Sequence, residues 1–291
     1  MKNTKPKVRL WSVLTGLTAI LTVAAIVGNI IANQYATTLN VALNASTYKI
    51  IKGETTGDAE YFKKGFASDE EREAYEAELC ATVEAEGAAL LKNENNALPL
   101  ASGAKVSLFG HGSVDLMYGG TGSGSVDTSK APNLKDALEA QGITINQTLW
   151  DLYKSDSMMS KYSRMTPASI SDTLEANTQY AVNEAPWSAL SSAESSFAEY
   201  GDAAIVVLSR SGGEGADLPS GANGTNDSWI SGQEGDGNYL ALSAEEIELL
   251  QNLKALKDNG TFKNIIVLIN SSNAIELDFL NPAICGEDYG I

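Results

Sequence analysis

Between Ala203 and Asp217 the chain reads Ala-Ala-Ile-Val-Val-Leu-Ser-Arg-Ser-Gly-Gly-Glu-Gly-Ala-Asp. Its first part, 203–209, is an apolar, β-branched run without polar alternation, which predicts a strand buried on both faces of a parallel sheet. The glycines that follow predict a sharp, exposed loop at the carboxyl end of that strand, where open α/β sheets bind their ligands. Glu214 stands between two of these glycines. We therefore expect its carboxylate to be presented to a ligand, the alternative being an ordinary solvated loop acid.

Around this stretch, short apolar runs alternate with helical patterns. Such alternation predicts an α/β fold with a mostly parallel sheet and helices on both faces, an α/β sandwich. Strands are expected at 106–109, 143–145, 203–208, 265–269 and 283–285. Helices are expected from Ser68 to about residue 93, and at 133–141, 149–159, 167–180, 187–199 and 243–256. The last helix begins with Ser243-Ala-Glu-Glu246, which has the pattern of a capping box.

The amino-terminal segment has the pattern of a membrane anchor. Residues 1–9 are basic, and no charged residue occurs from Leu10 to Tyr48. Residues 10–32 can cross a hydrocarbon layer of about 30 Å, whereas a cleaved signal peptide has an apolar core of roughly 7–15 residues. We expect an uncleaved, single-pass signal anchor at 10–32, with a cleaved signal peptide as the alternative.

This anchor implies a division of the chain by location. The basic flank, 1–9, is expected to lie in the cytoplasm, and everything after the anchor outside the cell membrane. Residues 33–67 are expected to form a polar tether, and 68–291 one folded domain that is incomplete at its carboxyl-terminal end.

Composition excludes several classes of function. The net charge is -17, and no cluster of Lys and Arg follows the first residues, so we expect no nucleic-acid partner. The chain has one histidine, His111, which makes Ser-His-Asp catalysis and a multi-histidine metal site improbable. Of the two cysteines, Cys80 is expected to be a buried thiol, and nothing indicates whether it pairs with Cys285. We expect neither a metal nor a cofactor.

A second glycine-rich segment, Gly119-Gly-Thr-Gly-Ser-Gly124, follows the strand expected at 106–109. It does not fit the dinucleotide pattern Gly-x-Gly-x-x-Gly, and the Gly-Lys-Ser/Thr of a P-loop is absent. No Gly-x-Ser-x-Gly elbow of an α/β-hydrolase occurs in the sequence. A structural turn and a ligand-binding loop remain as alternatives for this segment.

Four motifs in the same order resemble those of glycoside hydrolase family 3, the β-glucosidase and β-xylosidase group. They are Glu86-Gly-Ala-Ala-Leu-Leu-Lys-Asn-Glu-Asn-Asn-Ala-Leu-Pro-Leu100, then Lys105-Val-Ser-Leu-Phe-Gly110 with the Gly119–Gly124 segment, Gly213-Glu-Gly-Ala-Asp217, and Asn264-Ile-Ile-Val-Leu-Ile-Asn-Ser-Ser-Asn-Ala-Ile-Glu-Leu277. Each is weak alone, but together they cover roughly 74–291. The resemblance implies the α/β sandwich domain of that family.

The resemblance also implies roles for individual residues. Glu214 matches the general acid/base, and Glu234, in a downstream Glu-Gly-Asp element, is the alternative. Ser123 and Gly122 match the loop that contacts the sugar. Trp229 is expected either to stack on the sugar at the leaving-group side or to pack under its own loop. The sequence departs from the family at Leu218, where an arginine is common, which puts in doubt the ion pair that orients the acid loop.

In this family the nucleophile, an aspartate, lies on a (β/α)8 barrel, which needs about 250 residues. The residues ahead of the sandwich domain are too few for one. We therefore expect a truncated member of the permuted type, in which the barrel follows the sandwich domain. The implied function is a retaining, β-glucosidase-like, membrane-anchored extracellular hydrolase of β-linked glycosides, and this chain alone is expected to be inactive. The alternative is a non-catalytic, membrane-tethered carbohydrate-binding module.

Overall fold

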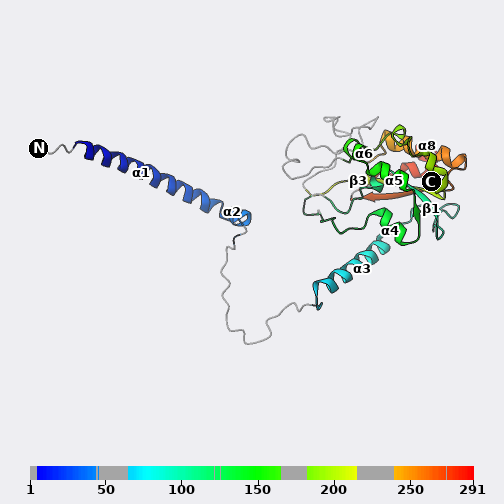
Figure 1. Cartoon of the computed structure of the whole chain (residues 1–291), viewed down its shortest axis with the longest axis horizontal. Helices are drawn as coiled ribbons and strands as arrows, with labels where there is room; N and C mark the ends of the chain where they lie inside the picture. Colours follow the sequence, from blue (N-terminus) through cyan, green and yellow to red (C-terminus); the bar gives the residue numbers. More distant parts are fainter. Residues whose placement is uncertain are drawn as a thin grey trace. The chain divides into compact units, whose positions relative to one another are not determined.

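The computed structural model in Figure 1 describes residues 5–43, 45, 65–120, 122–124, 126–164, 182–214, 239–272 and 274–291. The chain divides into two units, Met1–Gly87 and Ala88–Ile291, and each is described by itself. The helix expected at 167–180 lies outside the described residues.

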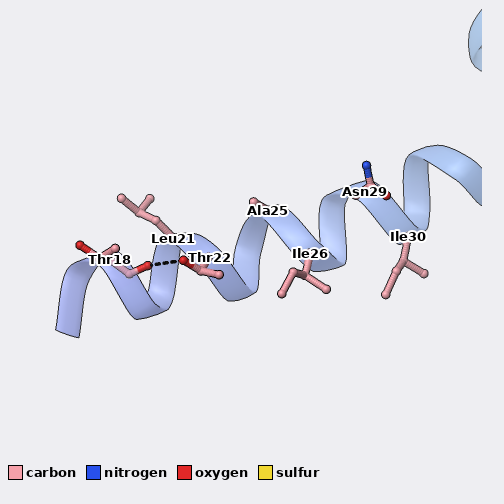
Figure 2. A pocket seen from close by; sticks show the side chains of 7 residues that line it. All are labelled: Thr18, Leu21, Thr22, Ala25, Ile26, Asn29 and Ile30. Atoms are coloured by element: carbon pink, nitrogen blue, oxygen red, sulfur yellow. Dashed lines mark hydrogen bonds between the residues drawn. The ribbon is translucent and has the colours of Figure 1, made fainter. Parts of the chain in front are cut away.

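The described residues of the first unit form the helices α1 (Lys5–Gln34), α2 (Ala36–Ala42) and α3 (Asp69–Gly87). α1 contains a stretch, Val8–Gln34, that is long and apolar enough to cross a membrane. Two threonines on this stretch bond to the main chain of the same helix. The Thr18 hydroxyl donates to the Leu14 carbonyl at 2.9 Å, and the Thr22 hydroxyl donates to the Thr18 carbonyl at 2.8 Å (Figure 2). These threonines therefore bring no unpaired donor into an apolar surrounding.

α3 begins where the sequence predicts it, because the Ser68 hydroxyl accepts a hydrogen bond from the Glu71 N–H at 3.2 Å. It ends earlier than predicted, at Gly87. Cys80 lies on this helix and is exposed, so the expectation of a buried thiol is wrong. The reason is that no side chain of α3 is buried.

In the second unit the described strands form one parallel sheet in the order β2–β1–β3–β4. The strands are β1 (Lys105–Phe109), β2 (Thr144–Ile145), β3 (Ala203–Arg210) and β4 (Ile265–Ser271). The register pairs Phe109 with Val206 and Val206 with Val267. Four of the five strands predicted from the sequence are therefore present.

Helices and 3-10 turns cover the sheet on both faces (Figure 1). They are α4 (Leu134–Ala140), α5 (Gln147–Lys154), α6 (Asp156–Lys161), α8 (Ala244–Asp258), and the turns η3 (Trp187–Leu190) and η4 (Glu194–Tyr200). Every residue of β3 is buried, and its side chains alternate between two apolar cores. Val206 packs into the core that contains α5 and α8, and Ile205 into the core lined by α4. This arrangement confirms the predicted α/β fold.

The fifth predicted strand is wrong. Residues 283–285 belong to a short helix, α9 (Pro282–Cys285). The Asn281 side chain caps it by accepting the Ala283 N–H, proline occupies its first turn, and Gly286 ends it in the left-handed conformation. Three apolar residues are too few for periodicity to separate a strand from a helix.

Candidate active site

The candidate site lies where the strand order reverses. The chain leaves β1 toward β2 on one side and leaves β3 toward β4 on the other, because the order is β2–β1–β3–β4. In open α/β sheets, ligands bind beyond the carboxyl ends of the strands at such a switch point. The segment after β1 contains the turns η1 (His111–Ser113) and η2 (Gly122–Gly124), and the segment after β3 carries Glu214.

Two residues predicted from the sequence meet here. The backbone N–H of Ser123 donates to Glu214 Oε2 at 2.8 Å, and the Ser123 hydroxyl donates to the same oxygen. Both residues are exposed. The carboxylate is therefore held on the glycine loop and faces solvent.

Gly122 has to be a glycine for this contact to form. Its φ is +67°, and a Cβ atom at this position would lie 2.8 Å from the Glu214 Cβ and 3.0 Å from Oε2. A side chain would therefore be strained and would push the carboxylate away. Gly120 approaches the other loop in the same way, since a Cβ there would lie 2.8 Å from the Gly212 carbonyl oxygen. The two loops thus pack backbone against backbone.

Hydrogen bonds from Ser123 shift the pKa of Glu214. Two hydrogen bonds from Ser123 lower the pKa of Glu214, because both donate to its charged form. The bond from the Ser123 hydroxyl has the larger effect, and the bond from the backbone N–H has the smaller one. A proton donor needs the opposite shift, from burial and a neighbouring negative charge. In the described state Glu214 is therefore an ionised base, and not yet the acid that the sequence predicts.

The loop after β1 is also attached to β4. The Asn270 side chain accepts from the Met117 N–H at 2.5 Å and donates to the Met117 carbonyl at 3.0 Å. This paired contact carries the loop from β1 across the end of β3 to β4. In the sequence Asn270 is only part of a strand-and-turn motif, because an amide side chain at a strand end carries no signal of its distant partner.

His111, the one histidine of the chain, is buried. The backbone N–H of His111 donates to Glu184 Oε2 at 2.7 Å, and the imidazole Nε2 of His111 lies 3.3 Å from Asp115 Oδ2. Burial raises the pKa of Asp115, but the His111 contact and the Arg164 guanidinium, 2.9 Å away, outweigh it, so the pKa is lowered. Burial also raises the pKa of Glu184, to about 7, against the opposing hydrogen bonds from His111 and Ala185.

A buried ion pair that the sequence does not indicate lies at the end of β3, four positions before Glu214. Arg210, the last residue of β3, is 0% exposed and forms a bidentate pair with Glu246 at 2.8 and 2.7 Å. Glu246 is also the capping-box residue of α8, which the sequence did predict. Only the combination of an arginine at a strand end with an acid in a distant cap could have indicated this pair.

The remaining site residues fall elsewhere. Glu234 and Trp229 lie outside the described residues, as does Leu218. Across the ranges that the structure describes, no group of three His, Cys, Asp or Glu side chains could hold a metal ion. Cys80 and Cys285 are both free.

The sequence profile of the glycosyl hydrolase family 3 C-terminal domain matches residues 88–285. The chain belongs to glycoside hydrolase family 3. The matched range begins at the residue where the second structural unit begins. It contains both loops of the candidate site, so Ser123 and Glu214 are residues of the family 3 domain.

Individual relatives agree with the assignment to family 3. The chain is 34% identical over 146 residues to beta-glucosidase A of Butyrivibrio fibrisolvens, an alignment that covers 48% of this chain and 15% of that protein. Two structures of beta-glucosidase 3B from Thermotoga neapolitana, with glucose and with alpha-D-glucose, share its fold at a TM-score of 0.51 and 24% identity. The alignments cover 71% and 72% of this chain and 26% of that protein. The chain thus spans 15% and 26% of the length of these relatives.

Proposed function

We propose that this domain supplies the general acid/base, Glu214, of a retaining β-glucosidase-like glycosidase. The observation that carries the proposal is the contact of Glu214 with Ser123 at the switch point of the sheet. Membership of family 3 and the relationship to beta-glucosidases support a β-linked glycoside as the substrate. The nucleophile would come from a barrel domain of the kind that the family resemblance implies.

The geometry suits the second half of a retaining reaction directly. In such a reaction one carboxyl group forms a glycosyl intermediate, while the other first donates a proton and then takes one from water. Glu214 is exposed, and its lowered pKa keeps it ionised, which is the state that accepts the proton of water.

The first half requires Glu214 to be protonated. We propose that a bound sugar takes over the Ser123 hydroxyl, which removes the largest cause of the lowered pKa. Docking against a barrel that bears a second carboxylate then raises the pKa, through desolvation and the nearby negative charge. Ser123 and Gly122 would contact the sugar in this state, and Trp229 would line the leaving-group side.

We further propose that residues 10–32 anchor the enzyme in the cell membrane, with 1–9 in the cytoplasm and the family 3 domain outside. The length and composition of α1 support this placement, together with the basic residues on one side only. Residues 33–67 would then act as the tether.

The test is to replace Glu214 by alanine in the protein expressed from its complete gene. We expect kcat for glycosides with poor leaving groups to fall by about 10²–10⁴-fold, the usual contribution of a positioned proton donor. Activated aryl glycosides should lose less in the first step, and added azide should rescue the second. Folding should be nearly unchanged, because Glu214 is an exposed loop residue.

Glu234→Ala is the matched control and should have little effect. If Glu234→Ala shows azide rescue while Glu214→Ala keeps normal rates, the acid/base is Glu234. If neither substitution changes hydrolysis by an active enzyme, this domain has no proton-transfer role and is a carbohydrate-binding module.

A further inference from the structure

Arg210 joins the two ends of the connection between β3 and α8. It lies on the outgoing end, four positions before Glu214. Its Nε donates to the Tyr239 carbonyl at 2.7 Å, and Nη2 donates to the Ala241 carbonyl at 2.6 Å, both on the returning end. The pair with Glu246 then ties the same side chain to the first turn of α8.

Every donor of this guanidinium has a partner. An arginine side chain carries five N–H groups in a fixed planar arrangement. The fifth bond, from Nη1 to the Ser209 carbonyl at 2.9 Å, completes the set with the two to Glu246 and those to Tyr239 and Ala241. A lysine has three donors on one nitrogen and could not form the same set.

Tyr239 holds the same two ends by a second contact. Its side chain is fully buried, and its hydroxyl accepts the Ser211 N–H at 2.9 Å and donates to the Ser211 carbonyl at 3.2 Å. One residue further along, Gly212 exchanges two hydrogen bonds of 3.0 Å with the Ser272 hydroxyl. The chain is therefore fixed up to two residues before Glu214.

Stability alone does not account for an ion pair in this place. Desolvation of two buried charges offsets most of their attraction, and well-packed apolar residues can often replace such a pair without loss of stability. What apolar residues cannot replace is the directional attachment of three carbonyl groups to one planar side chain. The geometry therefore points to a role in placing the loop.

We propose that Arg210, with Glu246, is the positioning residue of the acid loop, and that it fixes the point from which Glu214 reaches Ser123. The catalytic part of this inference rests on the role proposed above for Glu214, whereas the anchoring part does not. Arg210 would replace the loop-orienting arginine that the family resemblance leads one to expect at position 218.

The experiment measures amide hydrogen exchange of the full chain in detergent for the variant Arg210→Met/Glu246→Leu. Exchange at 210–214 and at 239–242 should accelerate on the order of tenfold or more, because the bonds from Arg210 to carbonyl groups on the returning end are lost and the two ends then open locally more often. Exchange in β1 and in the middle of α8 should stay as in the unmodified protein. The double variant is used because a single substitution leaves an unpaired buried charge.

Ser243→Ala is the matched control. It removes the cap of α8, whose hydroxyl accepts the Glu246 N–H, without touching Arg210. Exchange should rise in the first turn of α8 but not at 210–214. Unchanged protection at 210–214 in the double variant, or equal loss in Ser243→Ala, would overturn the anchoring role. Should the double variant not fold, Arg210→Lys is used, and full protection in that variant would have the same meaning.

Activity then separates the two proposals. In the protein from its complete gene, the double variant should lower kcat for poor leaving groups with little change in KM, as Glu214→Ala does. If the loop ends lose protection while Glu214→Ala itself has no effect, the anchor stands and the acid/base assignment fails. If Glu214→Ala abolishes turnover while the double variant keeps full kcat, Arg210 is not a positioning residue.

Discussion

Ser123 forms two hydrogen bonds to one oxygen of Glu214, and the side-chain bond is the larger cause of the lowered pKa. The substitution Ser123→Ala removes that bond and keeps the backbone one. We expect the pKa of Glu214 to rise, because the charged form loses its strongest donor. Carboxyl-carbon NMR titration of the chain measures it directly. Ser192→Ala, at an exposed serine outside the site, should leave the pKa unchanged, and an unchanged pKa in Ser123→Ala would show that the contact does not form in solution.

Gly122 and Gly142 form a matched pair of glycines. Both have a positive φ, +67° and +78°, but only at Gly122 would a Cβ meet other atoms. Alanine at either position should cost about 1–2 kcal/mol of stability through backbone strain. Only Gly122→Ala should also displace Glu214 and change its titration. Urea unfolding of both variants, with NMR titration of Glu214, distinguishes strain from displacement. Equal titration curves would mean that the close approach at Gly122 is unimportant.

The residues of the site differ in how far sequence could reveal them. Glu214 stands between glycines directly after a buried strand, which indicates an exposed, ligand-facing acid, whereas Ser123 was indicated only by the resemblance to family 3. The role of Arg210 could not be predicted, since Tyr239, Ala241 and Glu246 lie 29 to 36 positions away and two of them contribute only backbone carbonyl groups. Main-chain acceptors have no sequence signature, which is why the loop anchor appears only in the structure.

Among the elements, strands with long apolar runs and helices with side-chain caps were predicted well. α8 has the complete capping box that Ser243 and Glu246 indicate. The region 187–199 was predicted as one helix, but the structure has two 3-10 turns there, η3 and η4. They are separated by Ser191-Ser-Ala193, and serine competes for local backbone hydrogen bonds in non-helical conformations. Weak local preferences of this kind leave the decision to tertiary packing.

The prediction about an element concerns whether the apolar helix α1 is cleaved. We expect it to remain attached in the mature protein, because its apolar stretch, Val8–Gln34, is longer than a signal-peptide core. Amino-terminal sequencing of the mature protein, together with carbonate extraction of membranes, measures this. A mature terminus between 32 and 55 would identify a cleaved signal peptide instead.

For the molecule as a whole, Glu184 should make stability depend on pH. Burial raises the pKa of this carboxyl group from its ordinary 4.5 to about 7. Between these two values the folded protein holds a proton that the unfolded chain has released. The contribution of Glu184 is therefore complete below about pH 4.5 and is lost as pH rises through 7, by about 3 kcal/mol.

Urea unfolding as a function of pH measures this contribution. Glu184→Gln cannot titrate, so its free energy of unfolding should fall less steeply than that of the unmodified protein between pH 4.5 and 7. The difference between the two curves isolates Glu184 from the other acids. Parallel curves would contradict the raised pKa.

Ser123 and Glu214 are 91 positions apart in the chain, although they touch in the folded protein. At a synthesis rate of about 5–20 residues per second, the serine leaves the ribosome roughly 5–20 s before the glutamate. The glycine loop and β1 must therefore wait for β3 to arrive before either has its neighbour. During this interval the nascent protein has no contact between Ser123 and Glu214, and the contact can form only when β3 has joined the sheet.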